Sequence, residues 1–155
     1  MMLKILTLIF PFIRPSEASA DSLKAKMDIL LPAMAWVESR NNPNCIGDDG
    51  DAIGIYQIHY VYWQDAVEHD KTIGGKYEDC FKPKYAEKIV RAYMDRYAPE
   101  NATFEQLARI HNGGPSGHNR NSTIKYWKKI QKRLNNEPDE HPGELTKTRN
   151  RKGNR

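Results

Sequence analysis

The chain has 155 residues, which is enough for one domain with its own core but not for several domains. Three Trp, eight Tyr and four Phe supply much of the expected burial, and no segment is long and apolar enough to span a bilayer. The formal net charge of +4 and the pI near 9.0 favour an anionic partner such as a cell-wall polymer, nucleic acid or lipid headgroups.

The N-terminus has the pattern of a secretory signal peptide. Lys4 gives a positive start, residues 5–13 form an apolar run too short to cross a membrane, and residues 18–20 end the segment with small side chains. We therefore expect residues 1–20 to be a signal peptide that is cleaved after Ala20, and the protein to be secreted or periplasmic. An uncleaved N-terminal anchor is the alternative.

A helix is expected directly after this cleavage site. Asp21 or Ser22 can cap it. Its apolar residues recur at helical spacing: Leu23, Met27, Leu30, Leu31 and Met34. Pro32 falls inside the pattern, which predicts a kink or a break into two helices.

Glu38 closes the apolar stretch and is followed by a polar loop, residues 41–51. A carboxylate at such a position is partly removed from water, which disfavours its charged form and suits it to donate a proton near neutral pH. The alternative, when Glu38 is considered alone, is that it is an ordinary solvated residue in the last turn of the helix. The motifs that follow in the chain favour the proton donor.

The rest of the chain is predicted to be mostly helical. Residues 52–58 are short, apolar and partly β-branched, which predicts a strand or an extended segment. Thr103 with Gln106 forms a capping-box pattern, and Thr123 can cap the last helix. Four further helices are expected, at residues 60–68, 83–97, 103–110 and 123–134.

Apolar residues nearly vanish after Leu134. Acidic residues come first in this segment and basic residues last, a composition typical of a disordered, charged tail over residues 135–155. The folded domain is therefore expected to comprise residues 21–134. A basic stretch at residues 125–133 would suit nucleic acid or a membrane surface, but it lacks interleaved exposed aromatic residues, so neither partner is expected.

The two cysteines, Cys45 and Cys80, are expected to pair, because pairing is the default in an exported chain. A bridge across this long loop would stabilise the fold by about 3–4 kcal/mol on the chain-entropy estimate. The chain has no Cys-x-x-Cys motif, and its histidines show no ligand spacing relative to the cysteines, so no metal site is expected.

Three polar patches lie at the edges of helices or short apolar runs: Glu38-Ser39, residues 47–58 and residues 111–114. In this order they resemble the lysozyme-like superfamily, in particular soluble lytic transglycosylase and goose-type lysozyme domains. Those proteins have a Glu-Ser at a helix end, a Gly-x-x-Gln-[Ile/Val] segment, and a helix ending in Asn-x-Gly. Residues 108–115, followed by Tyr126-Trp127, are also similar to the equivalent stretch of invertebrate-type lysozymes.

The resemblance covers residues 27–134 and implies a mainly α, α+β lysozyme-like fold with a short strand or extended segment beside the site. It implies a glycosidase that cleaves the β-1,4 bond between MurNAc and GlcNAc in peptidoglycan, with Glu38 as the general acid. Two alternatives stay open. One is a lytic transglycosylase, which gives 1,6-anhydro products, and the other is a non-catalytic wall- or chitin-binding module on the same fold.

Asp48 matches an Asp in the corresponding loop of goose-type enzymes and is the candidate second carboxylate, with Asp49 and Asp51 as neighbours that could replace it. An ordinary Asp-Gly turn is the alternative for this cluster, and it lacks the terminal Glu of a calcium loop. His59 stands where goose-type enzymes often have a further Asp.

The resemblance also implies a set of substrate contacts, in which the main chain of residues 54–58 lines the glycan site. The candidate contact residues are Ser39, Asp51, Tyr56, Gln57, Ile58, His111, Asn112, Gly113 and Tyr126. Tyr60, Tyr62 and Trp63 are candidate sugar-stacking platforms. We expect a monomer that acts on peptidoglycan glycan strands, without cofactor, nucleic acid or stable membrane insertion.

Overall fold

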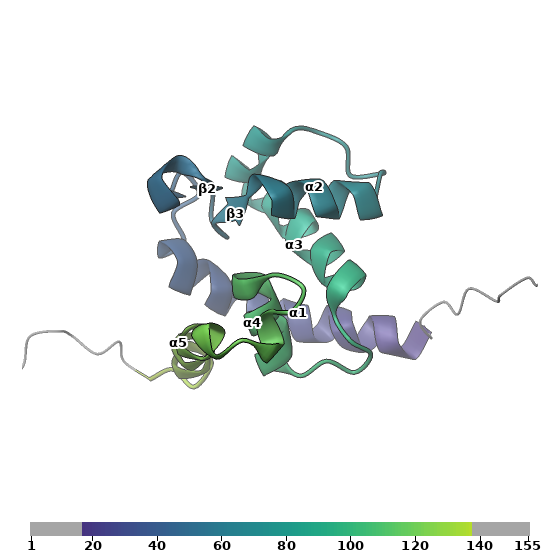
Figure 1. The fold of residues 1–155 in the computed structure, drawn as a ribbon, viewed down its shortest axis with the longest axis vertical. Helices are drawn as coiled ribbons and strands as arrows, with labels where there is room; N and C mark the ends of the chain where they lie inside the picture. Colours follow the sequence, from purple (N-terminus) through teal and green to yellow (C-terminus); the bar gives the residue numbers. More distant parts are fainter. Residues whose placement is uncertain (1–16, 138–155) are drawn as a thin grey trace, which may run out of the picture.

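Helix α1 (Glu17–Ser39) is the longest element of the computed structural model, which describes residues 17–137 (Figure 1). The helix begins at Glu17, so Asp21 and Ser22 lie inside it and the predicted caps are wrong. The predicted cleavage point after Ala20 also lies within α1, whereas residues 1–16 of the predicted signal peptide lie outside the described residues. Within residues 17–137, no helix is long and apolar enough to cross a membrane.

The predicted break at Pro32 is not observed, because α1 continues through it as one α-helix. Pro32 is exposed, while Leu31 and Ala33 on either side of it are buried. The missing proline N–H therefore affects the solvent side of the helix, where water can satisfy the freed carbonyl. Packing of the buried face favours one continuous helix through Pro32.

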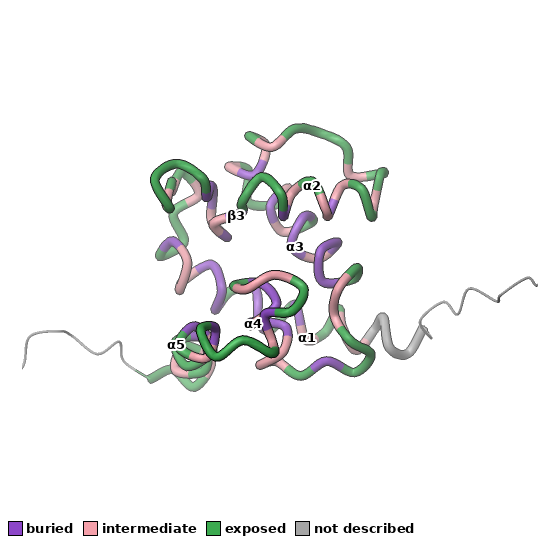
Figure 2. Tube along the Cα trace, viewed as in Figure 1, coloured by how far each residue is buried: buried purple, intermediate pink, exposed green. Residues whose placement is uncertain are grey.

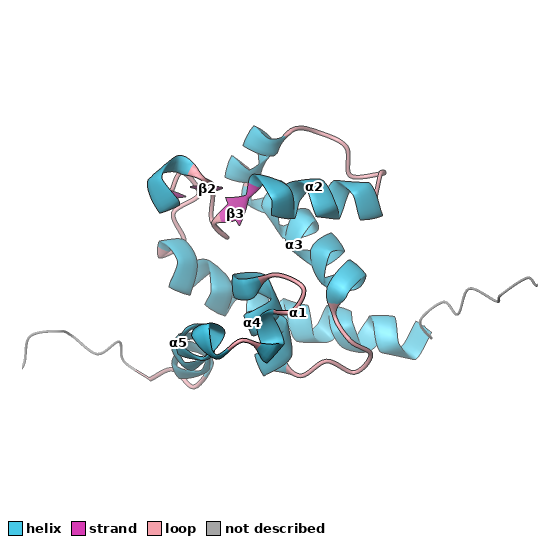
Figure 3. Cartoon of the chain, in the orientation of Figure 1, coloured by secondary structure: helices cyan, strands magenta, loops and turns pink. Residues whose placement is uncertain are grey.

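A three-stranded antiparallel sheet follows α1 in the order β1-β2-β3 and lies at one side of the otherwise helical molecule (Figure 3). Its strands are β1 (Ile46–Gly47), β2 (Ala52–Ile53) and β3 (Ile58–His59). Ile53 pairs with both Ile46 and Ile58, and the tight β2–β3 connection contains Gly54 and Gln57. The predicted extended segment at residues 52–58 is therefore a small hairpin.

The helices predicted after the sheet are confirmed with small shifts of their ends. They are α2 (Tyr60–His69), α3 (Pro83–Tyr97), α4 (Phe104–Gly113) and α5 (Ile124–Leu134). Short 3-10 helices connect them: η1 (Asp48–Gly50), η2 (Tyr77–Phe81), η3 (Gly117–Asn119) and η4 (Asn121–Thr123). The last eighteen residues of the predicted charged tail, 138–155, lie outside the described residues.

Two predicted helix caps have different outcomes. The Thr103–Gln106 capping box is confirmed: the Gln106 N–H donates to Thr103 Oγ1 at 3.2 Å, and the Thr103 N–H donates to Gln106 Oε1 at 2.9 Å. Thr123 is the residue before α5, but its hydroxyl lies 2.8 Å from the Gly117 carbonyl oxygen and does not cap the helix. The hydroxyl of Thr123 is instead used to fix the loop between α4 and α5.

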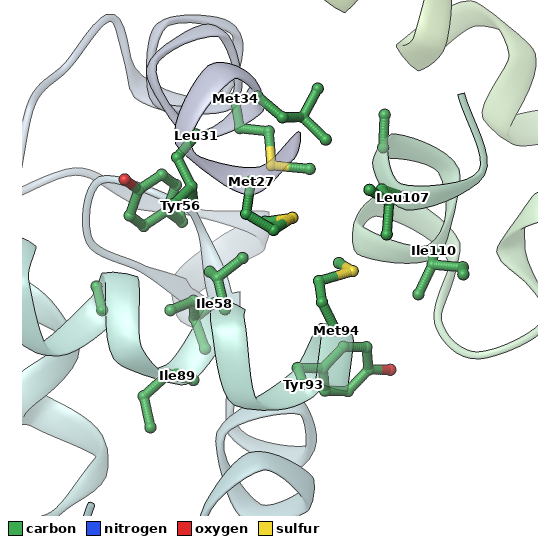
Figure 4. Packing of buried hydrophobic residues seen from close by; sticks show 14 of the residues in the cluster. Met27, Leu31, Met34, Tyr56, Ile58, Ile89, Tyr93, Met94, Leu107 and Ile110 are labelled. Atoms are coloured by element: carbon green, nitrogen blue, oxygen red, sulfur yellow. The ribbon is translucent and has the colours of Figure 1, made fainter. Parts of the chain in front are cut away.

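The core lies where α1, α3 and α4 meet, and the buried parts of the chain face this region (Figure 2). Sulfur-containing and aliphatic side chains dominate it, with Met27, Met34, Met94, Leu107 and Ile110 at its centre (Figure 4). Tyr56 and Ile58 extend the core under the sheet, which attaches the hairpin to α1.

Cys45 and Cys80 are free thiols in the structure, so the predicted disulfide is not formed. Both cysteine backbones approach Gly54: the Gly54 N–H donates to the Cys45 carbonyl at 2.9 Å, and a Cβ on Gly54 would lie 2.2 Å from the Cys80 carbonyl oxygen. Burial raises the pKa of the Cys80 thiol to about 12, which disfavours the thiolate that disulfide chemistry requires.

Candidate functional site

Glu38 lies in the last turn of α1, and its side chain is only 17% exposed. The neighbouring Ser39 is buried, and its hydroxyl lies 2.9 Å from the carbonyl oxygen of Ile55 and 3.1 Å from that of Ala35. This contact ties the end of α1 to the β2–β3 connection. The position of Glu38 is thus fixed by the helix and by the hairpin together.

A buried histidine lies against Glu38. His111, near the end of α4, has a side chain that is 3% exposed, and its Nε2 is 3.5 Å from Glu38 Oε1. On the other side of the ring, Nδ1 is 3.1 Å from the hydroxyl of Tyr62 in α2. Residues from α1, α2 and α4 therefore meet around one carboxylate.

Two tyrosines complete the surroundings of Glu38. Burial raises the pKa of Tyr62 and of Tyr126 well above the ordinary range, and the negative charge of Glu38 contributes to both shifts. Both phenols therefore stay protonated and can donate hydrogen bonds. The Tyr126 hydroxyl interacts with Glu38 electrostatically, but it has no partner at regular hydrogen-bond geometry among the described residues.

The surroundings of Asp48 are much more exposed to solvent than those of Glu38. Asp48 is in the exposed η1 segment, and its Oδ2 lies 2.9 Å from Nε2 of His59 at the end of β3. The two side chains are 71% and 46% exposed, respectively. The Asp48 backbone adopts a left-handed conformation with φ of 48°, which the turn imposes together with the next residue, Asp49.

Most of the predicted substrate contacts in the β2–β3 hairpin are made by side chains that stabilise the fold. The Gln57 carboxamide donates to the carbonyls of Gly54 at 2.9 Å and Cys45 at 3.3 Å, so it holds the β2–β3 connection. Ile58 is 1% exposed and Tyr56 is 6% exposed, and both lie in the core (Figure 4). Burial, assisted by the charge of a nearby glutamate, raises the pKa of Tyr56 to about 12. These three side chains therefore stabilise the hairpin and the core.

The remaining predicted contacts are divided between surface and interior. Asp51 and Asn112 are exposed, and the Asp51 carbonyl accepts a hydrogen bond from the Tyr77 hydroxyl at 3.0 Å. Gly113 lies at the end of α4, where a Cβ would lie 2.5 Å from Thr123 Cγ2. Gly113 therefore permits close packing of α4 against the loop before α5.

Sequence reasoning missed two contacts made by histidines of the site. Tyr62 was expected to form a sugar platform, but it is 8% exposed and contacts His111. His59 was expected only to replace an acidic residue, yet it pairs with Asp48. No sequence signal identifies either contact, because the partners are distant in the chain or belong to different elements.

Within residues 17–137, no group of three or more His, Cys, Asp or Glu could hold a metal ion. A pocket of about 450 Å³ between α1, α2 and α3 is lined by residues such as Met27, His69 and Asp95, and by none of the predicted site residues. The candidate site is therefore defined by the residues around Glu38 and not by this pocket.

The chain is similar to known proteins of one family. The sequence pattern of the Destabilase family matches residues 29–133. The chain is 33% identical over 125 residues to Lysozyme 1 of Crassostrea virginica, covering 76% of this chain and 66% of that protein. It is 40% identical over 81 residues to Lysozyme of Magallana gigas, covering 50% of this chain and 56% of that protein. The chain thus spans less than two thirds of the length of these two relatives.

The fold is also similar to solved structures. The crystal structure of Tapes japonica lysozyme matches with a TM-score of 0.56 at 33% sequence identity, over 69% of this chain and 87% of that one. The α+β lysozyme-like fold predicted from the sequence is therefore confirmed. The matched range includes residues 108–115, the stretch in which the similarity to invertebrate-type lysozymes was found.

Proposed function

The chain belongs to the Destabilase family, and from this premise we propose that it is an exported glycosidase that hydrolyses the β-1,4 bond between MurNAc and GlcNAc in peptidoglycan. Relatives in the comparison are named lysozymes, which supports this substrate class. The observation that carries the proposal is the environment of Glu38, a helix-end carboxylate that is 17% exposed and surrounded by a buried histidine and two buried phenols.

Glu38 acts as the general acid. Cleavage of a glycosidic bond requires a proton on the leaving oxygen while positive charge develops on the sugar ring. The Glu38 carboxyl group is partly buried but still 17% exposed, so it can be held in place by the protein and still reach the glycosidic oxygen of a bound substrate.

Asp48 acts as the second carboxylate. Its side chain is 71% exposed, and a carboxylate so open to water suits a charged role, either positioning the attacking water or stabilising the cation. His59 orients it from 2.9 Å. Asp51 and Asn112, which are exposed on the hairpin and at the end of α4, are available as substrate contacts.

The test is digestion of purified peptidoglycan by the wild type, by Glu38→Gln and by a matched exposed control, Glu78→Gln, followed by product masses. We expect the wild type and the control to release fragments with reducing ends, and Glu38→Gln to release none. Products one water lighter would assign lytic transglycosylase chemistry instead. Wall binding without products would indicate a non-catalytic module, and full lysis by Glu38→Gln would overturn the acid assignment.

Export is part of the same proposal. The N-terminal pattern and the extracellular location of peptidoglycan support secretion with cleavage after Ala20. N-terminal sequencing of protein recovered outside the producing cell should find Asp21 as the first residue. Size-exclusion chromatography of that material tests the expected monomer.

A further inference from the structure

We infer that His111 is a positioning residue that holds Glu38 Oε1 through its Nε2–H, and that Tyr62 sets the imidazole tautomer that makes this contact possible. The inference rests on the proposed role of Glu38 as the general acid. It replaces the sequence-based expectation that His111 touches the substrate, since the His111 side chain is 3% exposed and lies against Glu38.

The tautomer follows from the Tyr62 hydroxyl. Tyr62 is buried, and burial raises its pKa well above the ordinary range, so the phenol keeps its proton. A buried hydroxyl needs an acceptor for that proton, and among the described residues the atom within reach is His111 Nδ1, at 3.1 Å. Nδ1 must then carry a lone pair, which leaves the ring proton of a neutral imidazole on Nε2.

The Nε2–H of His111 faces Glu38 Oε1 across 3.5 Å. This separation exceeds that of an ordinary hydrogen bond, as is common for catalytic contacts before the substrate is bound. An oxygen that faces a donor serves as an acceptor, so the acidic proton of Glu38 belongs on Oε2. On cleavage the Oε2–H bond breaks, the proton moves to the glycosidic oxygen, and the new carboxylate keeps the Nε2–H donor.

Packing keeps the two rings in these positions. The Tyr62 ring stacks on Tyr93 with centroids 3.5 Å apart and an interplanar angle of 12°, and it meets the His111 ring edge-on at 82°. The Tyr126 ring lies on a further side, 6.3 Å from the imidazole centroid. The groups that face Glu38 are therefore His111 from α4, Tyr62 from α2 and Tyr126 from α5.

The first measurement reads the tautomer without reference to activity. In ¹⁵N-histidine-labelled wild type at neutral pH, we expect the His111 signals of a ring protonated on Nε2 and unprotonated on Nδ1. In Tyr62→Phe the bias toward this tautomer should weaken, while the remote control Tyr97→Phe, whose hydroxyl binds Asp65, should leave it unchanged. A wild-type ring protonated on Nδ1 would overturn the inference.

The second measurement separates positioning from binding. We expect His111→Phe, which keeps a flat ring but has no donor, to lower kcat by about tenfold to a hundredfold with KM changed by less than about twofold. His111→Gln retains an N–H donor and should recover part of kcat. A His111→Phe enzyme with wild-type kcat, or a Gln variant no better than Phe, would contradict the positioning role.

The two measurements also distinguish the inference from the proposed function. If the wild type cleaves no glycan, the function fails, while the tautomer experiment still tests the Tyr62–His111 geometry. If wild type cleaves glycan but the ring is protonated on Nδ1, the positioning inference fails alone. Should His111→Phe not fold, the Gln variant and Tyr62→Phe carry the same comparison.

Discussion

Two carboxylate–histidine pairs formed by predicted site residues differ in their surroundings. Glu38 and His111 are 17% and 3% exposed, and their atoms are 3.5 Å apart. Asp48 and His59 are 71% and 46% exposed, and their atoms are only 2.9 Å apart. The closer pair lies in water and the looser pair lies in the protein interior.

The difference shows that distance alone does not rank the two pairs. An exposed ion pair is screened by solvent and contributes about 0–1 kcal/mol, however short the contact. A partly buried carboxylate depends on its few neighbours, because little water remains to solvate it. Two carboxylates in such different surroundings suit two different roles, one as acid and one as charged group.

The largest expected effect separates the two carboxylates directly. Glu38→Gln should lower kcat by about a thousandfold or more, because no other described group beside it can donate the proton in its place. Asp48→Asn should lower kcat by only about tenfold to a hundredfold, since water and neighbouring carboxylates partly replace its charge. Rates on purified peptidoglycan provide the measurement, and a larger loss in Asp48→Asn would reverse the assignment.

A second expected effect concerns the turn that attaches the Asp48 side to the core. Gly54 has φ of +78°, and a Cβ there would lie 2.2 Å from the Cys80 carbonyl oxygen, so Gly54→Ala should lower the free energy of unfolding by about 3 kcal/mol or more. Gly74→Ala is the matched control, with φ of +57° and no atom within 4 Å of a new Cβ.

The control should lose only about 1 kcal/mol from its backbone strain. Urea unfolding of both variants measures the difference. Equal losses in the two variants would mean that contact with the Cys80 backbone does not hold the hairpin.

A third prediction uses the buried tyrosines of the interior. Burial raises the pKa of Tyr93, which stacks on Tyr62, from 10.0 to about 12, and Tyr56 shows a similar rise. The unfolded chain therefore loses these protons first. The contribution of these two phenols to the free energy of unfolding should be constant below pH 10 and fall as pH rises from 10 through 12.

In Tyr93→Phe, the decrease in the free energy of unfolding at alkaline pH should be smaller than in wild type by about 2–3 kcal/mol. In Tyr60→Phe, at an exposed position, this decrease should stay almost the same as in wild type. Urea unfolding between pH 8 and pH 12 provides the measurement. Identical alkaline curves for wild type and Tyr93→Phe would show that this phenol is not the group that titrates.

The smallest expected effect is at the exposed pair. His59→Ala should change the free energy of unfolding by less than about 1 kcal/mol, and added salt should reduce even that difference. Thermal or urea unfolding at low and high ionic strength tests this. A decrease in the free energy of unfolding as large as that expected for a buried contact would show that the Asp48–His59 pair is not screened by solvent and resembles the Glu38–His111 pair.

The sequence by itself determined the helices and the order of the polar patches. The apolar spacing of α3, α4 and α5, the Thr103–Gln106 cap and the position of Glu38 at a helix end are local properties of neighbouring residues, and the structure has each of them. The break expected at Pro32 is not observed, because local propensity does not include the packing of the opposite helix face.

Only the tertiary structure decided which side chains meet. Tyr62 and His111 are 49 residues apart, and nothing in either segment shows that one ring will orient the other. The same holds for Tyr56, which the hairpin turns into the core, and for the two cysteines, which remain free thiols. Helical and strand periodicity fix which face of a segment is buried, but the partner on that face is chosen by packing between segments.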